Sequence, residues 1–384
     1  MVKMVLTSDW LLGMRFPGFG EVAGRLREER SRAVERVLGL AEANGADLVL
    51  VAGNAFADNG VAKEVVDLAM DLLERHDSVP VTLVPGRRDR LGPTSIYLSE
   101  TWISRRPDHV RVLTSQRPEV VEGTGVTLHP WPVGMTPGSP PEAVEERSRA
   151  EGPFRVGVVP RGVFSSSGAG SSPRPPVPFR GETTMDLVVR GESEMRSWPE
   201  DRTIAPGTPE PFSFVSTSPG QVVLVDTGGG AGGGYDHQAL PTGRLRWVFE
   251  EVEAFSREDV SALINWMSEL PGPERTLIQL RVRGSGPVNL LASLTGLAEC
   301  CGDLLVCRVD TSPFRPIVGG EVPHVGGSRT VTGRVLEELL GRVLEDQRSV
   351  LRSTVTGASK EGGGTTVERR ALEIMLDQLG VEGA

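Results

Sequence analysis

The first 90 residues alternate between short apolar runs and longer amphipathic stretches. Apolar runs at 2–6, 48–52 and 79–84 predict strands, and the central one is apolar throughout, as in a sheet that is covered on both faces. Residues 21–43 and 62–75 repeat apolar side chains at helical spacing. In the second helix we expect these side chains to be buried: Val65, Leu68, Ala69, Leu72 and Leu73. The alternating order predicts a parallel sheet with right-handed crossovers, and therefore an α/β fold.

The middle of the chain has shorter and less regular patterns. Apolar runs predict further strands at 110–113, 126–130, 154–159, 185–189 and 221–226. Residues 165–178 are rich in Ser, Gly and Pro and predict a surface insertion. Residues 228–234 form a second stretch of this kind, which separates the strand at 221–226 from the segment 240–247.

A second α/β unit is predicted beyond residue 245, where we place a domain boundary. Its expected elements are strands at 249–253, 276–283 and 304–309, and helices beginning at Ser256 and spanning about 290–298. Asp259 stands three residues after Ser256, which is the spacing of a capping box.

The end of the chain carries two amphipathic helices, predicted at 334–345 and 366–379, joined through the glycines at 362–364. They either cover the preceding domain or lie in a groove of another chain. The pattern therefore divides the chain into three domains, 1–245, 246–322 and 323–384.

Composition limits the class of protein. The 384 residues carry a net charge of −10, which argues against general clamping of nucleic acid but leaves room for a local basic groove. No apolar stretch is long enough for a membrane span, and residues 1–9 lack the features of a secretory signal. Three cysteines, Cys300, Cys301 and Cys307, are too few for a disulfide framework and predict a reducing, cytoplasmic setting.

Candidate chemistry lies in three loops that follow predicted parallel strands, at 8–13, 52–59 and 85–89. Functional residues of parallel α/β sheets gather at these carboxyl ends. The loops resemble the signatures of calcineurin-like metallophosphoesterases, in particular the SbcD-type DNA-repair nuclease subunits, which read Asp-x-His, Gly-Asp-x-x-Asp and Gly-Asn-His-Asp at these places. Residues 185–194 resemble the strand that leads into Gly-His-x-His, and 206–212 resemble the following proline-glycine-serine turn.

The resemblance covers roughly residues 1–310 and implies an α/β sandwich, a small capping domain that touches DNA, and C-terminal helices. In that family two cations, Mn or Mg, share a bridging carboxylate and activate water for attack on a phosphodiester. The scaffold residues of the motifs are retained at Gly13, Gly53, Gly86, Gly191 and Asp89. Asp9 also stands where the family has a metal ligand.

The other ligand positions are altered. Leu11 replaces a histidine, Asn54 replaces the bridging aspartate, and Arg87 and Arg88 replace an asparagine and a histidine. Glu192 and Glu194 stand in place of two further histidines, and the last histidine position falls at Arg161 or Pro160. None of the chain's five histidines occupies a motif position. We therefore expect no metal and no catalytic residue in the family's sense.

The substitutions suggest a fold retained after its metal site was lost. Arg87 and Arg88, with Arg161 and Arg190, would neutralise the pocket where cations once lay, a hypothesis that solvent-directed arginines would oppose. Arg87, Arg88 and Arg90 either hold a phosphate backbone or form an inert salt-bridged cluster.

Three functions follow as hypotheses. The first is a non-catalytic scaffold or DNA-end-binding subunit that pairs with an SbcC-like SMC-type ATPase through the C-terminal helices and forms a homodimer through the helix at 62–75. The second is an active nuclease whose metal site is rebuilt from carboxylates and one amide: Asp9, Asn54, Asp58, Asp89, Glu192 and Glu194. The third is an interaction protein with no nucleic-acid role. None of the three involves a membrane.

Overall fold

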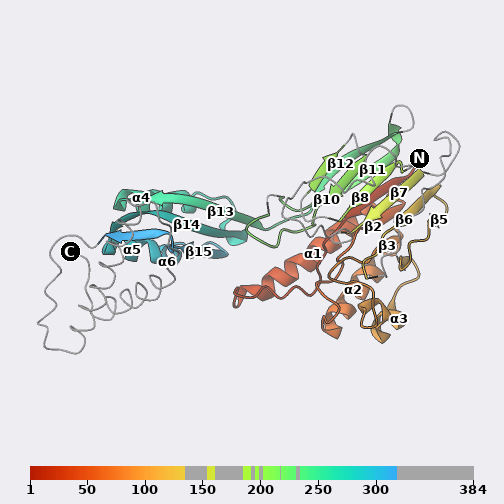
Figure 1. Cartoon of the computed structure of the whole chain (residues 1–384), viewed down its shortest axis with the longest axis horizontal. Coiled ribbons are helices and arrows are strands. Elements are labelled where there is room, and N and C mark those ends of the chain that lie inside the picture. The colour runs from red at the N-terminus through yellow and green to blue at the C-terminus, as the bar shows by residue number, and fades with distance from the viewer. Residues whose placement is uncertain are drawn as a thin grey trace, which may run out of the picture. The chain divides into compact units, whose positions relative to one another are not determined.

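The computed structural model divides the chain into two compact units, Met1–Trp247 and Val248–Ala384 (Figure 1). The residues it describes are 1–134, 154–160, 185–191, 195–198, 202–216, 218–230 and 234–317. The expected insertion at 165–178 and the expected C-terminal helices at 334–345 and 366–379 lie outside these ranges. Within them, no helix combines the length and apolar character that crossing a bilayer requires.

The first sheet of unit 1 contains the predicted parallel strands. It is built from β1 (Lys3–Thr7), β2 (Leu48–Val51), β3 (Val81–Leu83), β4 (Val110–Val112), β11 (Gln221–Gly230) and β12 (Gly234–Pro241). Strands β1 to β4 are parallel, whereas β11 runs antiparallel to β1 and carries β12 at the edge. Sequence patterning missed β12, because most residues of this edge strand are exposed and none is fully buried.

The second sheet has the strand order β5-β6-β7-β8-β10-β9. Its strands are β5 (Glu119–Val121), β6 (Val126–Pro130), β7 (Phe154–Val159), β8 (Leu187–Arg190), β9 (Met195–Trp198) and β10 (Thr203–Pro206). Strands β6, β7, β8 and β10 are parallel, and the two edge strands are antiparallel to their neighbours. Met4 and Leu6 of β1 pack against this sheet in one apolar core, so unit 1 is a sandwich of two sheets.

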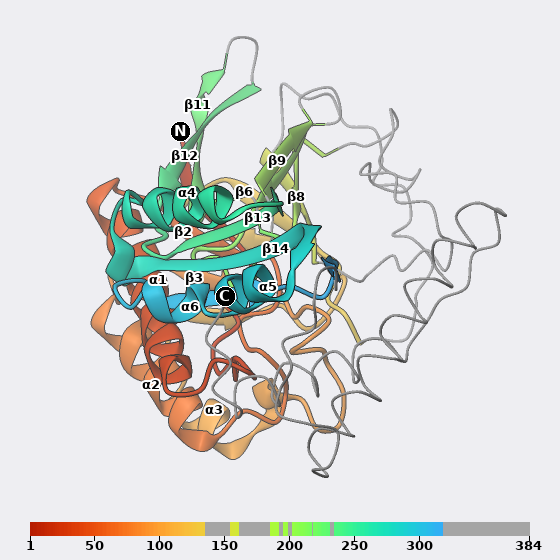
Figure 2. The same ribbon diagram turned by 90° about the vertical axis from the view of Figure 1, so that its left-hand side faces the viewer.

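Three helices cover the outer face of the first sheet: α1 (Val22–Ala43), α2 (Lys63–Arg75) and α3 (Glu100–Arg105) (Figure 2). The predicted α1 and α2 are confirmed. The buried face of α2 differs from the prediction, since Leu68 is 39% exposed while Val66 and Met70 are buried. The helix is rotated slightly, so that Leu68 lies at the margin of its apolar face.

Unit 2 is a small α/β unit. Its elements are β13 (Arg246–Ala254), α4 (Arg257–Ser268), β14 (Thr276–Pro287), α5 (Val288–Thr295), α6 (Leu297–Cys300), β15 (Val306–Asp310) and β16 (Phe314–Ile317). Strand β14 is central and pairs with β15 and β16 in parallel. The capping box of Ser256 and Asp259 is confirmed at the start of α4. The single helix expected at 290–298 is instead two helices, which meet at Gly296. The α/β class predicted from the sequence is therefore confirmed in both units.

Candidate functional site

The loops that follow β1 and β2 run side by side beyond the carboxyl ends of the strands. The Asp9 amide donates to the Gly53 carbonyl at 3.1 Å, and the Leu11 amide donates to the Asn54 carbonyl at 2.9 Å. Pro160, at the end of β7, closes over the second loop, because a Cβ at Gly53 would lie 2.7 Å from the Pro160 Cβ. Three strands therefore bring Asp9, Asn54 and Pro160 to one place, as the sequence spacing suggested.

Three residues of these loops have a left-handed backbone. Asp9, Leu11 and Asn54 have φ values of 52°, 50° and 56°. Asp and Asn tolerate this conformation, whereas for leucine it is unfavourable and has to be held by surrounding contacts. The Leu11 side chain is 1% exposed, so burial of its isobutyl group is one such contact. The loop thus keeps an unusual conformation even though Leu11 has no metal-binding atom.

The Asn54 amide joins all three loops. Its Nδ2 donates to Asp9 Oδ1 at 2.6 Å, and its Oδ1 accepts from the Arg88 backbone amide at 2.9 Å. This orientation is the one that satisfies both partners, since a carboxylate only accepts and a backbone N–H only donates. Gly86 is needed beside it, because a Cβ at Gly86 would lie 2.5 Å from Asn54 Oδ1.

Asp89 turns inward and braces the second and third loops. It accepts from the backbone amides of Gly86 at 2.7 Å, Asn54 at 3.2 Å and Phe56 at 3.3 Å. The Tyr97 hydroxyl donates to its second oxygen at 2.7 Å. Burial raises the pKa of Asp89, and these hydrogen bonds oppose the shift. Both oxygens of its carboxylate are therefore used in hydrogen bonds that join the second and third loops.

A buried arginine lies beneath the Asp9 loop and was not anticipated from the sequence. The Arg30 guanidinium donates to the carbonyls of Asp9 at 3.0 Å, Trp10 at 2.8 Å and Glu210 at 2.7 Å. Its carbon Cζ also lies 5.2 Å from the centre of the Phe212 ring. Burial lowers the pKa of Arg30 to about 10, so the side chain still carries its charge at neutral pH. The sequence does contain a signal for the burial of this arginine, because Arg30 falls on the apolar face of α1.

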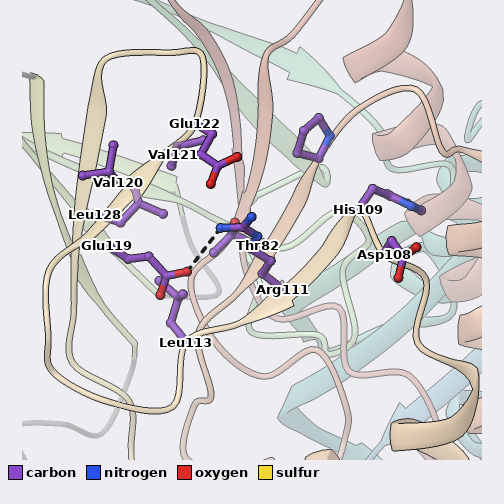
Figure 3. A pocket seen from close by; sticks show the side chains of 11 residues that line it. Thr82, Asp108, His109, Arg111, Leu113, Glu119, Val120, Val121, Glu122 and Leu128 are labelled. Atoms are coloured by element: carbon purple, nitrogen blue, oxygen red, sulfur yellow. Dashed lines mark hydrogen bonds and ion pairs between the residues drawn. The ribbon is translucent and has the colours of Figure 1, made fainter.

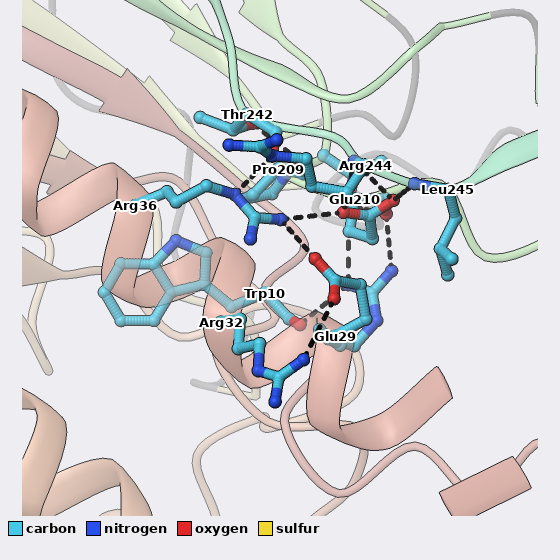
Figure 4. A network of polar contacts seen from close by, with 11 residues as sticks. Trp10, Glu29, Arg32, Arg36, Pro209, Glu210, Thr242, Arg244 and Leu245 are labelled. Carbon is cyan, nitrogen blue, oxygen red and sulfur yellow. Dashed lines mark hydrogen bonds and ion pairs between the residues drawn. The ribbon is translucent and has the colours of Figure 1, made fainter. Parts of the chain in front are cut away.

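Glu210 connects the turn after β10 to the end of unit 1 (Figure 4). Its buried carboxylate accepts from the backbone amides of Arg244 and Leu245, each at 2.9 Å, and from Arg36 Nη2 at 3.1 Å. Arg36 Nη2 also lies 2.9 Å from Glu29. Burial raises the pKa of Glu210 to about 7. Arg30, which binds the Glu210 carbonyl, therefore links the Asp9 loop to a second charged network.

The arginines that follow β3 lie on the surface. Arg87, Arg88 and Arg90 all have exposed side chains, and the Arg88 guanidinium donates to the Ala57 carbonyl at 3.4 Å. This arrangement counts against Arg87 and Arg88 as the groups that neutralise the interior of the pocket, whereas Arg190, at the end of β8, is half-buried and its Nη1 is buried. Arg30 is a further, fully buried cation, and its charge acts on Asp9. Arg161, Glu192 and Glu194 lie outside the described residues.

The described donor set does not fit the pair of cations that the family resemblance implies. Leu11 offers no donor atom, Asp89 is held by amides and a hydroxyl, and the Asn54 NH₂ group points at Asp9. Asp58 accepts from the Gly60 amide at 2.7 Å in a local turn. In the ranges that the structure describes, no cluster of three or more His, Cys, Asp or Glu side chains is arranged to hold a metal ion.

A pocket of about 270 Å³ lies elsewhere, at the edge of unit 1 between β4 and β5 (Figure 3). Its lining includes Leu113, Leu128 and His109, and the charges of Arg111 and Glu119 are paired at 3.5 Å. None of its lining residues belongs to the loops described above. It is therefore separate from the candidate site.

Comparisons with known proteins identify no family. No protein-family description matches the chain, and no curated protein sequence matches it significantly. Among solved structures, the crystal structure of TT1561 of Thermus thermophilus aligns with 62% of this chain and 98% of its own length, at 14% identity and a TM-score of 0.35. A likeness at that level identifies neither a family nor an activity.

Proposed function

We propose that this chain is a non-catalytic relative of the SbcD-type nuclease subunits, within the calcineurin-like metallophosphoesterases. In this proposal it acts as a scaffold or DNA-end-binding partner of an SbcC-like SMC-type ATPase in DNA repair or DNA processing. The order and spacing of the loop motifs support the family assignment. The observation that carries the loss of catalysis is the hydrogen bond from Asn54 Nδ2 to Asp9 Oδ1 at 2.6 Å.

This hydrogen bond supports the proposal through charge and donor geometry. A bridging ligand between two cations has to supply negative charge and free lone pairs. Asn54 is neutral, its NH₂ group faces the one retained acid, and its oxygen already accepts from the Arg88 backbone amide. The protein's own polar groups thus join loops that bound cations would join in an active relative.

The charge balance of the site supports the same conclusion. An unpaired buried carboxylate is costly, and in a metal-bound relative the cations would offset that cost. Here Arg30 lies against the Asp9 loop, and its positive charge interacts with the Asp9 carboxylate. Removing the metal therefore leaves no uncompensated acid at this position.

The proposed partners follow from the family resemblance. The predicted helices at 334–345 and 366–379 would bind the ATPase, and α2 would contribute to a homodimer. The exposed Arg87, Arg88 and Arg90 at the rim of the site are the candidate contacts for a phosphate backbone. Such contacts would weaken as salt concentration rises.

The first test measures bound metal and manganese-dependent nuclease activity on the same purified preparation, with Asp9→Ala as the control. We expect no stoichiometric metal and no cleavage that depends on Asp9. Bound metal together with cleavage that disappears in the Asp9→Ala protein would instead support the rebuilt site of Asp9, Asn54, Asp58, Asp89, Glu192 and Glu194.

A second test separates the scaffold from a protein with no nucleic-acid role. We expect salt-sensitive binding of DNA ends that weakens when Arg87, Arg88 and Arg90 are all changed to Gln. The matched control changes three exposed arginines outside these loops, Arg27→Gln, Arg106→Gln and Arg117→Gln. Equal binding by both variants, or no binding at any salt concentration, would remove the DNA-end part of the proposal.

A further inference from the structure

Three sulfur atoms from three different elements meet in unit 2. Met267 lies in α4, Cys301 directly follows α6, and Cys307 lies in β15. The Cys301 thiol donates to Met267 Sδ at 3.7 Å, and the Cys307 thiol is hydrogen-bonded to Cys301. The sulfurs therefore form a chain in which Cys301 touches both of the others.

The distance between two of these sulfurs suits a shared metal ion. With metal–sulfur bonds of about 2.3 Å, two sulfurs of a tetrahedral site lie about 3.8 Å apart. Cys301 Sγ and Met267 Sδ are 3.7 Å apart before any ion is placed between them. A single ion could therefore contact both of these sulfurs with little movement of the Cys301 and Met267 side chains.

The donor set selects the class of metal. A thioether binds hard cations such as Mg²⁺ or Mn²⁺ poorly, whereas thiolates and thioethers together favour soft ions such as Cu(I). We propose that Met267, Cys301 and Cys307 form a binding site for a soft monovalent metal ion of the Cu(I) type. This proposal concerns unit 2 alone and is independent of the function proposed above.

The surroundings of the sulfurs support binding of such an ion. Met267 is 1% exposed and belongs to the apolar core of the unit, which excludes water from one side. Cys301 and Cys307 are half-buried, so an ion can enter from solvent. Cys300 is exposed and is the sequence neighbour of Cys301, which makes it a natural control for surface thiol binding.

Binding has a defined proton balance. One Cu(I) ion would replace the protons of the Cys301 and Cys307 thiols and release both to solvent, with no change in oxidation state. Burial raises the pKa of Cys307 to about 12 and also raises the pKa of Cys301. Proton release therefore opposes binding, and the apparent affinity should increase with pH.

The test is an anaerobic titration of the full chain with Cu(I) supplied from a competing chromogenic chelator. We expect one Cu(I) per chain for the unchanged protein and for Cys300→Ser. Cys301→Ser and Cys307→Ser should abolish stoichiometric binding. Met267→Leu, which preserves size, should weaken binding by about tenfold or more.

Several outcomes would overturn the proposal. These are no binding in competition with the chelator, binding that survives both Cys301→Ser and Cys307→Ser, and binding that disappears in Cys300→Ser. A fourth is the loss of two thiols to an intramolecular disulfide with no bound copper, which would make the pair a redox element instead. If a cysteine variant fails to fold, Met267→Leu decides, since unchanged affinity in that variant excludes the three-sulfur site.

Discussion

Asn54 differs from the aspartate of the resembled family by one atom, an amide nitrogen in place of a carboxylate oxygen. That atom gives the side chain a hydrogen-bond donor. The side-chain amide donates to Asp9 and accepts from the Arg88 backbone amide, and a carboxylate at this position can perform only the second task. An aspartate would also place a second negative charge within hydrogen-bonding distance of Asp9. Both hydrogen bonds support the proposal that this site holds no cation.

Asn54→Asp should lower the free energy of unfolding by about 1–3 kcal/mol at neutral pH, because a hydrogen bond becomes a carboxylate–carboxylate contact. The loss should shrink at acidic pH, where the pair can share a proton. Urea denaturation at both pH values measures the change. The control is Asn265→Asp on the exposed face of α4, and an equal effect there would remove the special role of Asn54.

Arg30→Met should destabilise the protein more strongly, by roughly 2–4 kcal/mol. The variant leaves the carbonyls of Asp9, Trp10 and Glu210 without their charged donor inside the protein. The comparison is Arg27→Met, an exposed arginine one turn earlier in α1, for which little change is expected. Similar urea midpoints for the two variants would contradict the role assigned to Arg30.

Glu210 should impose a pH dependence on stability. Its pKa is about 7 in the folded protein, compared with 4.5 as the ordinary value, because burial disfavours the charged form. The folded state therefore binds this proton more tightly than the unfolded state does. The free energy of unfolding should fall as pH rises from about 4.5 to 7, and Glu210 should contribute at most roughly 3 kcal/mol to that fall. Glu210→Gln should flatten the unfolding free energy across this window, whereas exposed Glu269→Gln should not.

At the scale of elements, sequence patterning found most strands of both units but missed β5, β9, β10, β12 and β16. Strands β1, β2 and β7 carry apolar runs because both of their faces are covered. Strand β12 is mostly exposed, so its eight residues show no buried pattern. Strand β5 contains no buried residue, so it too lacks a buried pattern. Burial alone is not sufficient, because β10 is buried at all four positions and was also missed: its sequence, Thr-Ile-Ala-Pro, contains no long apolar run.

The start of α4 could be predicted because capping is a local interaction. The Asp259 amide donates to Ser256 Oγ, and the Asp259 carboxylate accepts from the Ser256 amide at 3.0 Å. Ser256→Ala should therefore lower stability by about 1 kcal/mol. Ser261→Ala, on the exposed side of the same helix, is the matched control. Thermal unfolding of the two variants should differ, and equal midpoints would show that the cap contributes little.

At the scale of the whole molecule, the location of the candidate site followed from strand order, but its internal chemistry did not. Asp9, Asn54 and Asp89 follow consecutive parallel strands, so their loops were expected at one edge of the sheet. The contact of Arg30 with Glu210 joins residues 180 positions apart. Such a contact depends on packing and side-chain direction, which no local pattern records.

The same long-range packing leads to a prediction for the intact protein. If polar groups of the chain already join the loops, divalent cations should have nothing to stabilise, and neither Mn²⁺ nor a chelator should move the midpoint of thermal unfolding. A rebuilt metal site would behave differently, because a ligand present at about 100 times its Kd stabilises the folded state by about 2.7 kcal/mol. A Mn²⁺-dependent rise that vanishes in Asp9→Ala would place a cation among the loops, and the closed, metal-free site would then be wrong. A rise that persists in Asp9→Ala would report binding elsewhere and leave the role of Asn54 intact.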